Sequence, residues 1–271
     1  YAATAYNTAA TSSTLNYTVN VALPTAATYA AGAASGTDYV LDDTNKTLAI
    51  NTGKGAAYWS ASDTSYLDYT ILLANDVDVS GFSWTPVGAD SDPFTGSFDG
   101  QGHSITGLTA SAASFAGLFS HAYGATIKNL CLSGSVQISN SVDGSYGGAL
   151  VAYAVKCTIV NCCSHTDVTA TSSGTASAAC AGGLVGIAES ATAISNCFNT
   201  GSVRATVSGV DWSYAYAGGI AGYNYDNNVN VINCYSIGIV TAANASANYA
   251  GGVVGYISGT VKNCYYLNSA A

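Results

Sequence analysis

Charged side chains are scarce in this sequence, and methionine is absent. Asp, Glu, Lys and Arg make up 8% of the 271 residues, whereas an ordinary soluble domain is about 25% charged. With only six Lys and Arg, no basic face is available to neutralise a phosphate backbone or an anionic bilayer. No apolar run approaches the roughly 18–20 residues that span a membrane. We therefore expect neither nucleic acid as a partner nor membrane insertion.

The eight cysteines show no spacing typical of a zinc site. Such cysteines indicate an oxidising, extracytoplasmic compartment. Residue 1 is tyrosine, so we expect an initiator methionine and a signal peptide to have been removed or excluded. The chain is therefore predicted to be extracellular, either secreted or exposed at the cell surface.

Two short phrases recur together five times in the second half of the chain. The first is a glycine followed by apolar residues, and its second glycines lie at 117, 148, 183, 219 and 252, which gives periods of 31, 35, 36 and 33 residues. The second phrase contains a shared asparagine, at Asn129, Asn161, Asn196, Asn233 and Asn263. A repeat of this length is typical of a solenoid, in which each unit buries its apolar face only against its neighbours.

Each unit offers three short strand candidates: one after the glycines, one before the asparagine, and one such as Val136–Ile138. Parallel strands of successive coils lie about 4.8 Å apart, and parallel crossovers are nearly always right-handed. The sequence therefore predicts an all-β, right-handed parallel β-solenoid (β-helix) with three short strands per coil and an N-terminal strand or cap region. We expect one continuous domain, with an N-terminal strand and capping region at 1–66, entry coils at 67–115, and five repeats over 116–271, the last incomplete.

Stacking places equal positions of successive coils above one another. The shared asparagines are expected to form an amide ladder along the axis. Two tyrosine columns are expected as well, one joining Tyr216 to Tyr249 and the other joining Tyr223 to Tyr256.

The cysteines also fall into columns, and neighbouring coils lie within the Cα separation that a disulfide needs. The ranked pairs are Cys131–Cys163, Cys162–Cys197 and Cys234–Cys264, which leaves Cys157 and Cys180 as a weak fourth pair. The alternative is a column of buried free thiols that act as small apolar residues. In both cases the cysteines are structural.

An alternating segment stands alone near the N-terminus. Its apolar positions are Leu15, Tyr17, Val19, Val21 and Leu23, and Pro24 follows them. This pattern is typical of a half-buried strand. The strand either covers the first coil of its own solenoid or is donated to the open last coil of the next subunit.

The residues Phe94–Leu108 leading into Ala116–Asn129, and later phrases such as Gly183-Leu184-Val185-Gly186, resemble bacterial surface proteins that carry GLUG repeats. The resemblance covers roughly residues 69–267. It implies a parallel β-solenoid in large extracellular, often adhesive, proteins. The repeats also occur beside the catalytic region of some immunoglobulin A-cleaving metallopeptidases, whose His-Glu-x-x-His zinc motif does not occur in this sequence.

The carboxylates of the central coils are scattered. No two of them occupy the same repeat position; they are Asp143, Asp167, Glu189, Asp211 and Asp226. Glycoside hydrolysis needs two carboxyl groups held about 5–10 Å apart, and no Cys–His pair indicates a nucleophile or a metal site. We therefore predict a chain that is not an enzyme and that has no catalytic residues, no cofactor and no metal.

Two functions remain. The favoured one is a structural subunit of an extracellular filament, whose partners are copies of itself, because low charge removes the repulsion that keeps chains apart. The alternative is a monomeric adhesin segment that binds a glycan or a host surface protein through aromatic loops with Trp212, Tyr214 and Tyr225. A polysaccharide-active β-helix enzyme is a third, disfavoured interpretation.

Overall fold

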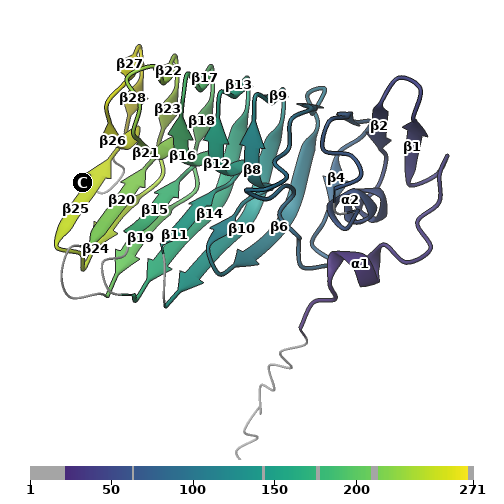
Figure 1. The fold of residues 1–271 in the computed structure, drawn as a ribbon, viewed down its shortest axis with the longest axis horizontal. Coiled ribbons are helices and arrows are strands. Elements are labelled where there is room, and N and C mark those ends of the chain that lie inside the picture. Colours follow the sequence, from purple (N-terminus) through teal and green to yellow (C-terminus); the bar gives the residue numbers. More distant parts are fainter. Residues whose placement is uncertain (1–21, 63, 142–143, 175–177, 209–212, 268–271) are drawn as a thin grey trace, which may run out of the picture.

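The computed structural model describes residues 22–62, 64–141, 144–174, 178–208 and 213–267. Within them the chain winds into coils that stack along the long axis of the molecule (Figure 1). The strands pair in parallel from coil to coil, and the one antiparallel pair among the described strands joins β1 (Tyr39–Asp42) to β2 (Thr47–Ile50). The predicted fold class, an all-β parallel β-solenoid, is confirmed.

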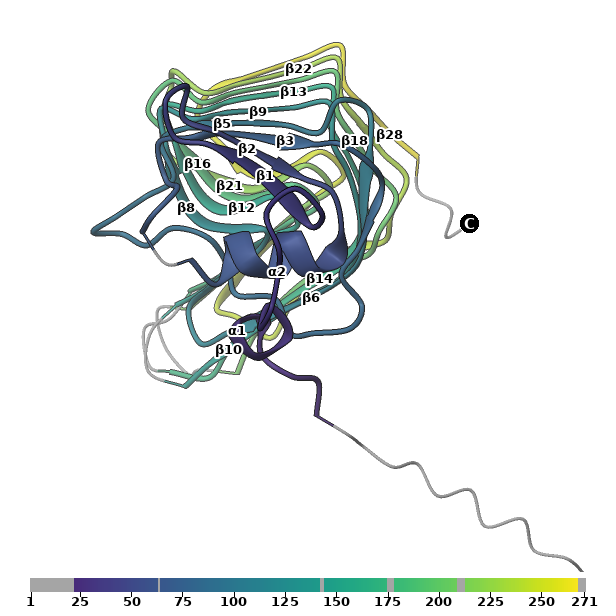
Figure 2. The same ribbon diagram turned by 90° about the vertical axis from the view of Figure 1, so that its right-hand side faces the viewer.

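Four sheets run along the solenoid, and Figure 2 shows them end on. The first sheet contains β1, β2, β3 (Thr70–Leu73), β5 (Ser97–Asp99), β9 (Thr126–Lys128), β13 (Thr158–Val160), β17 (Ala193–Ser195), β22 (Asn230–Ile232) and β27 (Thr260–Lys262). The second contains β4 (Val77–Asp78), β6 (Ser104–Ala112), β10 (Cys131–Asn140), β14 (Cys163–Ser172), β18 (Phe198–Asn199), β19 (Val203–Val207), β23 (Tyr235–Ser236), β24 (Val240–Ala243) and β28 (Tyr265–Tyr266).

The other two sheets are shorter and lie next to each other along the axis (Figure 1). The third contains β7 (Phe115–Ala116), β11 (Ser145–Gly148), β15 (Ala178–Gly182), β20 (Tyr214–Gly218) and β25 (Ala247–Gly251). The fourth contains β8 (Phe119–Tyr123), β12 (Val151–Val155), β16 (Val185–Glu189), β21 (Ala221–Asn224) and β26 (Val254–Ile257).

Each complete coil after β7 therefore contributes strands to four sheets where the sequence predicts three strands, and the second-sheet strand is split in two in the coils that contain β18 with β19 and β23 with β24. The additional segment precedes the glycines and forms the third sheet. The chain then turns sharply into the fourth sheet, and glycine is required there because a Cβ on Gly182 would overlap the carbonyl oxygen of Val185. The strand register places Gly148 beside Gly182. The predicted repeat aligns Gly148 with Gly183, so it is shifted by one residue at this coil.

The predicted amide ladder is confirmed. Each shared asparagine has a positive φ of 52–56°, a conformation that asparagine tolerates better than most residues. Its side-chain NH₂ group donates to the Oδ1 atom of the asparagine one coil earlier, over N···O distances of 3.1–3.3 Å. The series begins at Asp99, whose Oδ1 atom accepts from Asn129 at 3.0 Å. The ladder thus joins six successive coils along one edge.

Two helices cover the N-terminal end of the solenoid (Figure 2). They are α1 (Ala26–Tyr29) and α2 (Gly53–Ser60). Trp59 of α2 is only 2% exposed and contacts the rings of Trp84, Phe94, Phe98 and Phe119 at centroid distances of 5.4–6.4 Å. This aromatic cluster fills the first coils, whose interior would otherwise face water. Neither described helix has the length or apolarity needed to cross a membrane.

Candidate ligand-binding groove

Two columns of side chains point outward from the third and fourth sheets. The third-sheet column consists of Phe115, Tyr146, Cys180, Tyr216 and Tyr249. The fourth-sheet column consists of His121, Tyr153, Ile187, Tyr223 and Tyr256. Eight of these ten side chains carry aromatic rings. The columns run parallel to the solenoid axis over four coil spacings, or about 19 Å.

The two columns meet side by side because the sheets that carry them form a concave angle. Phe115 and His121 face each other with centroids 4.4 Å apart, and Tyr216 and Tyr223 do so at 4.6 Å. Rings also stack along each column, as in Tyr216 on Tyr249 at 5.1 Å. The result is a groove with aromatic walls on the outer surface of the solenoid, which we call the aromatic groove.

The groove is interrupted at its middle coil, where the columns hold Cys180 and Ile187 instead of rings. Both are almost fully buried, at 2% and 7% exposure. These two side chains line one end of a hollow with a volume of about 510 Å³ that extends over the next two coils as far as Tyr249 and Tyr256, and we call this hollow the gap. It is lined by Tyr146, Ala178, Cys180, Ile187, Tyr214, Tyr216, Tyr223, Tyr249 and Tyr256.

The interruption divides the rings into two groups. The N-terminal group contains Phe115, His121, Tyr146 and Tyr153. The C-terminal group contains Tyr214, Tyr216, Tyr223, Tyr225, Tyr249 and Tyr256. Among the described residues no ring contact joins the two groups.

The tyrosine hydroxyls in the groove are protonated and largely available to a ligand. Burial raises the pKa of Tyr216 and of Tyr223, with smaller contributions from neighbouring phenols and Cys180. Within the described part of the chain, the hydroxyls of Tyr216, Tyr223, Tyr249 and Tyr256 form no hydrogen bond. They are therefore free to donate to an acceptor on a bound molecule.

Two carboxylates, Glu189 and Asp90, act on the N-terminal rings of the groove, and Lys156 lies close by, where its Nζ atom donates to the Tyr123 hydroxyl at the end of β8. Burial, followed by the neighbouring Glu189 carboxylate and then Asp90, raises the pKa of Tyr153. Burial lowers the pKa of His121, and Asp90 opposes that change only in part, so the imidazole is neutral near pH 7. None of the side chains that line the gap is Lys or Arg. This arrangement favours neutral or positively charged ligands over anions.

The sequence predicted part of this site. The two tyrosine columns, Tyr216 with Tyr249 and Tyr223 with Tyr256, are confirmed by their strand pairing. Tyr214 lines the gap, and Tyr225, which is 68% exposed, stacks on Tyr223 at 6.3 Å. Trp212 lies outside the described residues.

Sequence reasoning missed the N-terminal ring group. Phe115, Tyr146, Cys180, Tyr216 and Tyr249 all stand two residues before the glycine at the end of a third-sheet strand or its equivalent. This constant distance of two residues from a glycine is the sequence pattern by which the column could have been found. It was hidden because the repeat was aligned on the second glycines instead of on the strands.

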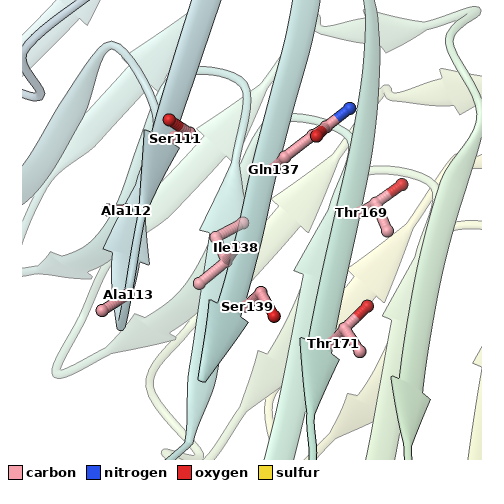
Figure 3. A pocket seen from close by; sticks show the side chains of 8 residues that line it. All are labelled: Ser111, Ala112, Ala113, Gln137, Ile138, Ser139, Thr169 and Thr171. Atoms are coloured by element: carbon pink, nitrogen blue, oxygen red, sulfur yellow. The ribbon is translucent and has the colours of Figure 1, made fainter. Parts of the chain in front are cut away.

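A second hollow of about 560 Å³ lies on the outer face of the second sheet. Figure 3 shows Ser111, Gln137 and Thr169 on neighbouring strands, followed by Ser139 and Thr171 one step further along the strands. These side chains offer small hydroxyl and amide groups and no ring or charge. The aromatic groove supplies more apolar contact per residue, so it is the stronger candidate for a ligand site.

The cysteines divide between one disulfide and six free thiols. The predicted Cys131–Cys163 disulfide is present, with Cα atoms 4.5 Å apart. In place of the predicted Cys162–Cys197 and Cys234–Cys264 bonds and the weak Cys157–Cys180 pair, the structure has free thiols. The inner column points into the core, where each thiol donates to a backbone carbonyl: Cys162 to Val160, Cys197 to Ser195, Cys234 to Ile232 and Cys264 to Lys262, over 3.1–3.4 Å.

One group of side chains has the proximity of a metal site. Ligand atoms of Cys131, Cys163 and His165 lie within 4.8 Å of one another. However, the two sulfurs are joined in the disulfide, and a metal needs thiolates. His165 instead contacts Thr200, with 2.5 Å between Nδ1 and Oγ1. The group therefore acts as a structural clamp between coils.

The predicted assembly strand falls mostly outside the described residues. Leu15, Tyr17, Val19 and Val21 lie outside the described residues, and Leu23 is 43% exposed in a segment without regular structure. At the opposite end of the solenoid, β25, β26, β27 and β28 are each the last described strand of a sheet. Exposed apolar side chains lie on or beside these strands, including Val261 of β27 at 42% and Leu267, the residue after β28, at 66%.

Comparisons with known proteins agree with this architecture. The family model described as the GLUG motif matches residues 177–204, a stretch that contains β15, β16 and β17 and the glycines between them. The predicted resemblance to GLUG-repeat proteins is confirmed. This motif and the Cys131–Cys163 disulfide both support the predicted extracellular location. No curated protein matches the chain.

A solved structure shares the fold. It is the crystal structure of a putative immunoglobulin A1 protease from Bacteroides ovatus, with a TM-score of 0.61 and 20% sequence identity. The match covers 86% of this chain and 78% of that chain. At this identity the likeness shows the fold alone.

The name of that neighbour contradicts the prediction that the chain is not an enzyme. The prediction relied on the scattered carboxylates and on the lack of a Cys–His pair, and a protein with the same fold is named a putative protease. Fold and function are separable, and one architecture serves many activities. A parallel β-solenoid is therefore no evidence against an enzyme.

Proposed function

We propose that this chain is the ligand-binding solenoid of an extracellular, adhesin-like protein, and that it holds an extended polymer in the aromatic groove. The observation that carries the proposal is the gap of about 510 Å³, which is lined by Tyr146 and by five tyrosines of the C-terminal ring group. Ligand sites are typically concave, mainly apolar, and supplied with a few polar groups that fix orientation. The rings supply the apolar area, and the unpaired tyrosine hydroxyls supply the polar groups.

The groove also has the shape expected for a polymer. It extends along the solenoid axis and draws equivalent side chains from five successive coils. A ligand with a repeating backbone, either a glycan or a protein segment, meets the same surface several times. Several weak contacts of this kind together give a higher affinity, because the translational and rotational entropy of the ligand is lost only once, at the first contact.

The test is binding to immobilised panels of extracellular glycans and host surface proteins by surface plasmon resonance. Tyr216→Ala combined with Tyr223→Ala is expected to weaken binding about tenfold or more, since two stacked rings are lost. Tyr265→Ala is the matched control, because it removes a tyrosine that is 72% exposed on the second sheet, away from the groove. Binding that survives the double substitution contradicts the proposal.

A second candidate function is assembly into a homopolymeric surface filament. The exposed edges of β25, β26, β27 and β28 support it, because unpaired strand edges invite pairing with another chain. The N-terminal end is covered by α2 and ends in the antiparallel strand β1. This cap opposes direct stacking of coil on coil, so the mechanism proposed is donation of residues 15–23 to the last coil of the next subunit.

Filament formation is tested by negative-stain electron microscopy of the full chain. Deletion of residues 1–23 is expected to abolish filaments. A variant that keeps the length but breaks the alternation, with serine at Leu15, Val19 and Val21, should behave like the deletion. Filaments that persist in both variants exclude strand donation, and a wild-type chain that stays monomeric at high concentration excludes the filament.

A further inference from the structure

One carboxylate lies at the single interruption of the ring columns. Glu189 stands two residues beyond Ile187 on β16, so both side chains point outward from the same face of the strand, about 7 Å apart. Burial is the main reason why the pKa values of Tyr153 and Tyr223 are raised, and the Glu189 carboxylate contributes to both. Tyr153 belongs to the preceding coil and Tyr223 to the following coil. The carboxylate therefore lies between the two ring groups, at the rim of the gap.

Glu189 has no cationic partner within the described part of the chain. None of the ion pairs there includes it. Lys156 follows Val155, which pairs with Glu189 on one side and with Tyr123 on the other. The Lys156 ammonium is held at Tyr123, 4.9 Å from the ring centroid and hydrogen-bonded to the hydroxyl over 2.6 Å, so it points away from the coil of Glu189. The negative charge of Glu189 is left for a ligand.

The floor of the groove beside Glu189 is apolar. In this coil the third-sheet column holds Cys180 and the fourth-sheet column holds Ile187. Burial raises the pKa of the Cys180 thiol, so it is uncharged. A group that crosses the groove here meets two apolar side chains and then a carboxylate about 7 Å beyond Ile187. A lysine side chain has the same order, because its ammonium is carried on a flexible four-carbon stem that packs on apolar surface.

We infer that the groove binds an extended protein segment and takes one lysine side chain of that segment across the interruption. The stem packs on Cys180 and Ile187, and the ammonium lies beside Glu189. We call this place the lysine site. The columns are interrupted once, so one lysine of the segment is bound in this way. This inference rests on the proposed binding function of the groove.

The rings on both sides of the lysine site favour an ammonium group over a neutral one. Tyr153 and Tyr223 each stand one coil spacing, or about 4.8 Å, from the position of Ile187. A cation is attracted to a tyrosine ring when it lies within about 6 Å of the centroid. The contact between Lys156 and Tyr123 shows that this surface already holds one ammonium in that way. At the lysine site Glu189 adds an opposite charge.

The experiment is a fluorescence-anisotropy titration of the full chain with labelled peptides of serine, threonine and valine around one central residue. About nine extended residues span about 30 Å, which exceeds the length of the groove. The central residue is lysine, norleucine, which keeps the stem without the charge, or diaminopropionate, which keeps the charge on a short stem. The lysine peptide is expected to bind about tenfold more tightly than the other two, because only lysine matches both the apolar floor and the carboxylate.

Glu189→Gln tests the carboxylate. The substitution removes the charge and keeps the size of the side chain, so the affinity of the lysine peptide should fall about tenfold, to that of the norleucine peptide. Asp167→Asn is the matched control. It removes one negative charge from β14 of the second sheet, outside the lining of the gap, and its side-chain oxygen can still accept from the Ser202 amide. It should leave all three affinities unchanged, and circular dichroism checks the fold of both variants.

The outcomes separate this inference from the function on which it rests. If the lysine peptide fails to bind, binds no better than the norleucine peptide, or binds Glu189→Gln as well as the wild type, the lysine site is refuted. Equal weakening by Asp167→Asn and Glu189→Gln also refutes it, because the attraction is then to the net charge of the chain.

An amino-sugar oligomer is titrated in parallel. If it binds in a manner that depends on Glu189 and the lysine peptide does not, the ligand class is wrong and the groove function stands. Binding of any probe that is lost when Tyr216→Ala is combined with Tyr223→Ala supports the groove function independently of the lysine site. If no probe and no panel molecule depends on these two tyrosines, both the lysine site and the groove function are refuted.

Discussion

At the scale of single residues, the shared asparagine stabilises each coil in two ways. Its backbone occupies the left-handed region, as at Asn196 with φ 54°. Its side chain links three coils, because Asn196 donates to Asn161 over 3.3 Å and accepts from Asn233 over 3.1 Å. Few other side chains tolerate this backbone and also carry both a donor and an acceptor.

Asn196→Ala is expected to lower the free energy of unfolding by about 3 kcal/mol, from two lost hydrogen bonds and a strained φ. Asn196→Gly separates the two effects, since glycine removes the hydrogen bonds but accepts the backbone, and it should cost about 2 kcal/mol. Urea unfolding followed by circular dichroism measures both. Equal unfolding midpoints for wild type and Asn196→Ala would show that the ladder is not stabilising.

The half-buried tyrosines of the groove make stability depend on alkaline pH. Burial raises the pKa of Tyr216 and Tyr223 in the folded state, whereas an unfolded tyrosine titrates near pH 10. The unfolded chain therefore loses these protons first, so their contribution is complete below about pH 10 and is lost as pH rises above it. Phenylalanine at both positions should flatten the decline of the urea midpoint above about pH 10; an unchanged slope argues against a role for these phenols.

At the scale of strands, the sequence predicted those features that depend only on the stacking of one coil on the next. Equal positions of neighbouring coils lie above one another, so the asparagine ladder and the Tyr216–Tyr249 column followed from the repeat. The angle between the third and fourth sheets did not follow. It depends on a turn after Gly182 that only the folded backbone reveals. The groove was therefore hidden, because it exists only where two columns from different sheets meet.

Disulfide pairing was hidden for a related reason. The sequence places Cys162 beside Cys197 as surely as Cys131 beside Cys163. It does not show which column faces the core and which faces outward. Cys162 and Cys197 are each 1% exposed and donate to backbone carbonyls, whereas Cys131 and Cys163 are partly exposed and bonded.

Gly182→Ala tests the turn between the third and fourth sheets. The new Cβ would overlap the Val185 carbonyl oxygen, and relief requires movement of two strands, so a loss of about 3 kcal/mol or more is expected. Gly102→Ala is the comparison: it has φ 86° but open space around the site, so it should cost only about 1–2 kcal/mol. If urea unfolding gave a similar loss of unfolding free energy for both variants, the cost of Gly182→Ala would come from backbone strain and not from overlap with the Val185 carbonyl oxygen.

At the scale of the whole molecule, the solenoid has two unlike ends. Trp59 and its aromatic neighbours close the N-terminal end, and the last described coil leaves apolar side chains exposed. Solenoid stability is approximately a sum over coils and their nearest-neighbour contacts. A change at the cap should therefore act mainly on the coils that touch it.

Trp59→Ala is expected to cost about 3–5 kcal/mol, from lost contacts and a cavity. Hydrogen–deuterium exchange read by mass spectrometry should show faster exchange in β3 and β5, whereas β20 and β21 stay protected. Ligand binding in the groove should persist in the same variant. Uniformly faster exchange along the whole chain would show that the cap and the distant coils unfold as one unit.

The two outward columns have a consequence for how such proteins diversify. The groove is a product of the repeat, because every coil adds one position to each column along with its core and ladder residues. Duplication or loss of one gene segment that encodes a coil changes the length of the binding surface by about 4.8 Å without disturbing its cross-section. Relatives that differ only in the number of coils are therefore expected to bind ligands of different lengths.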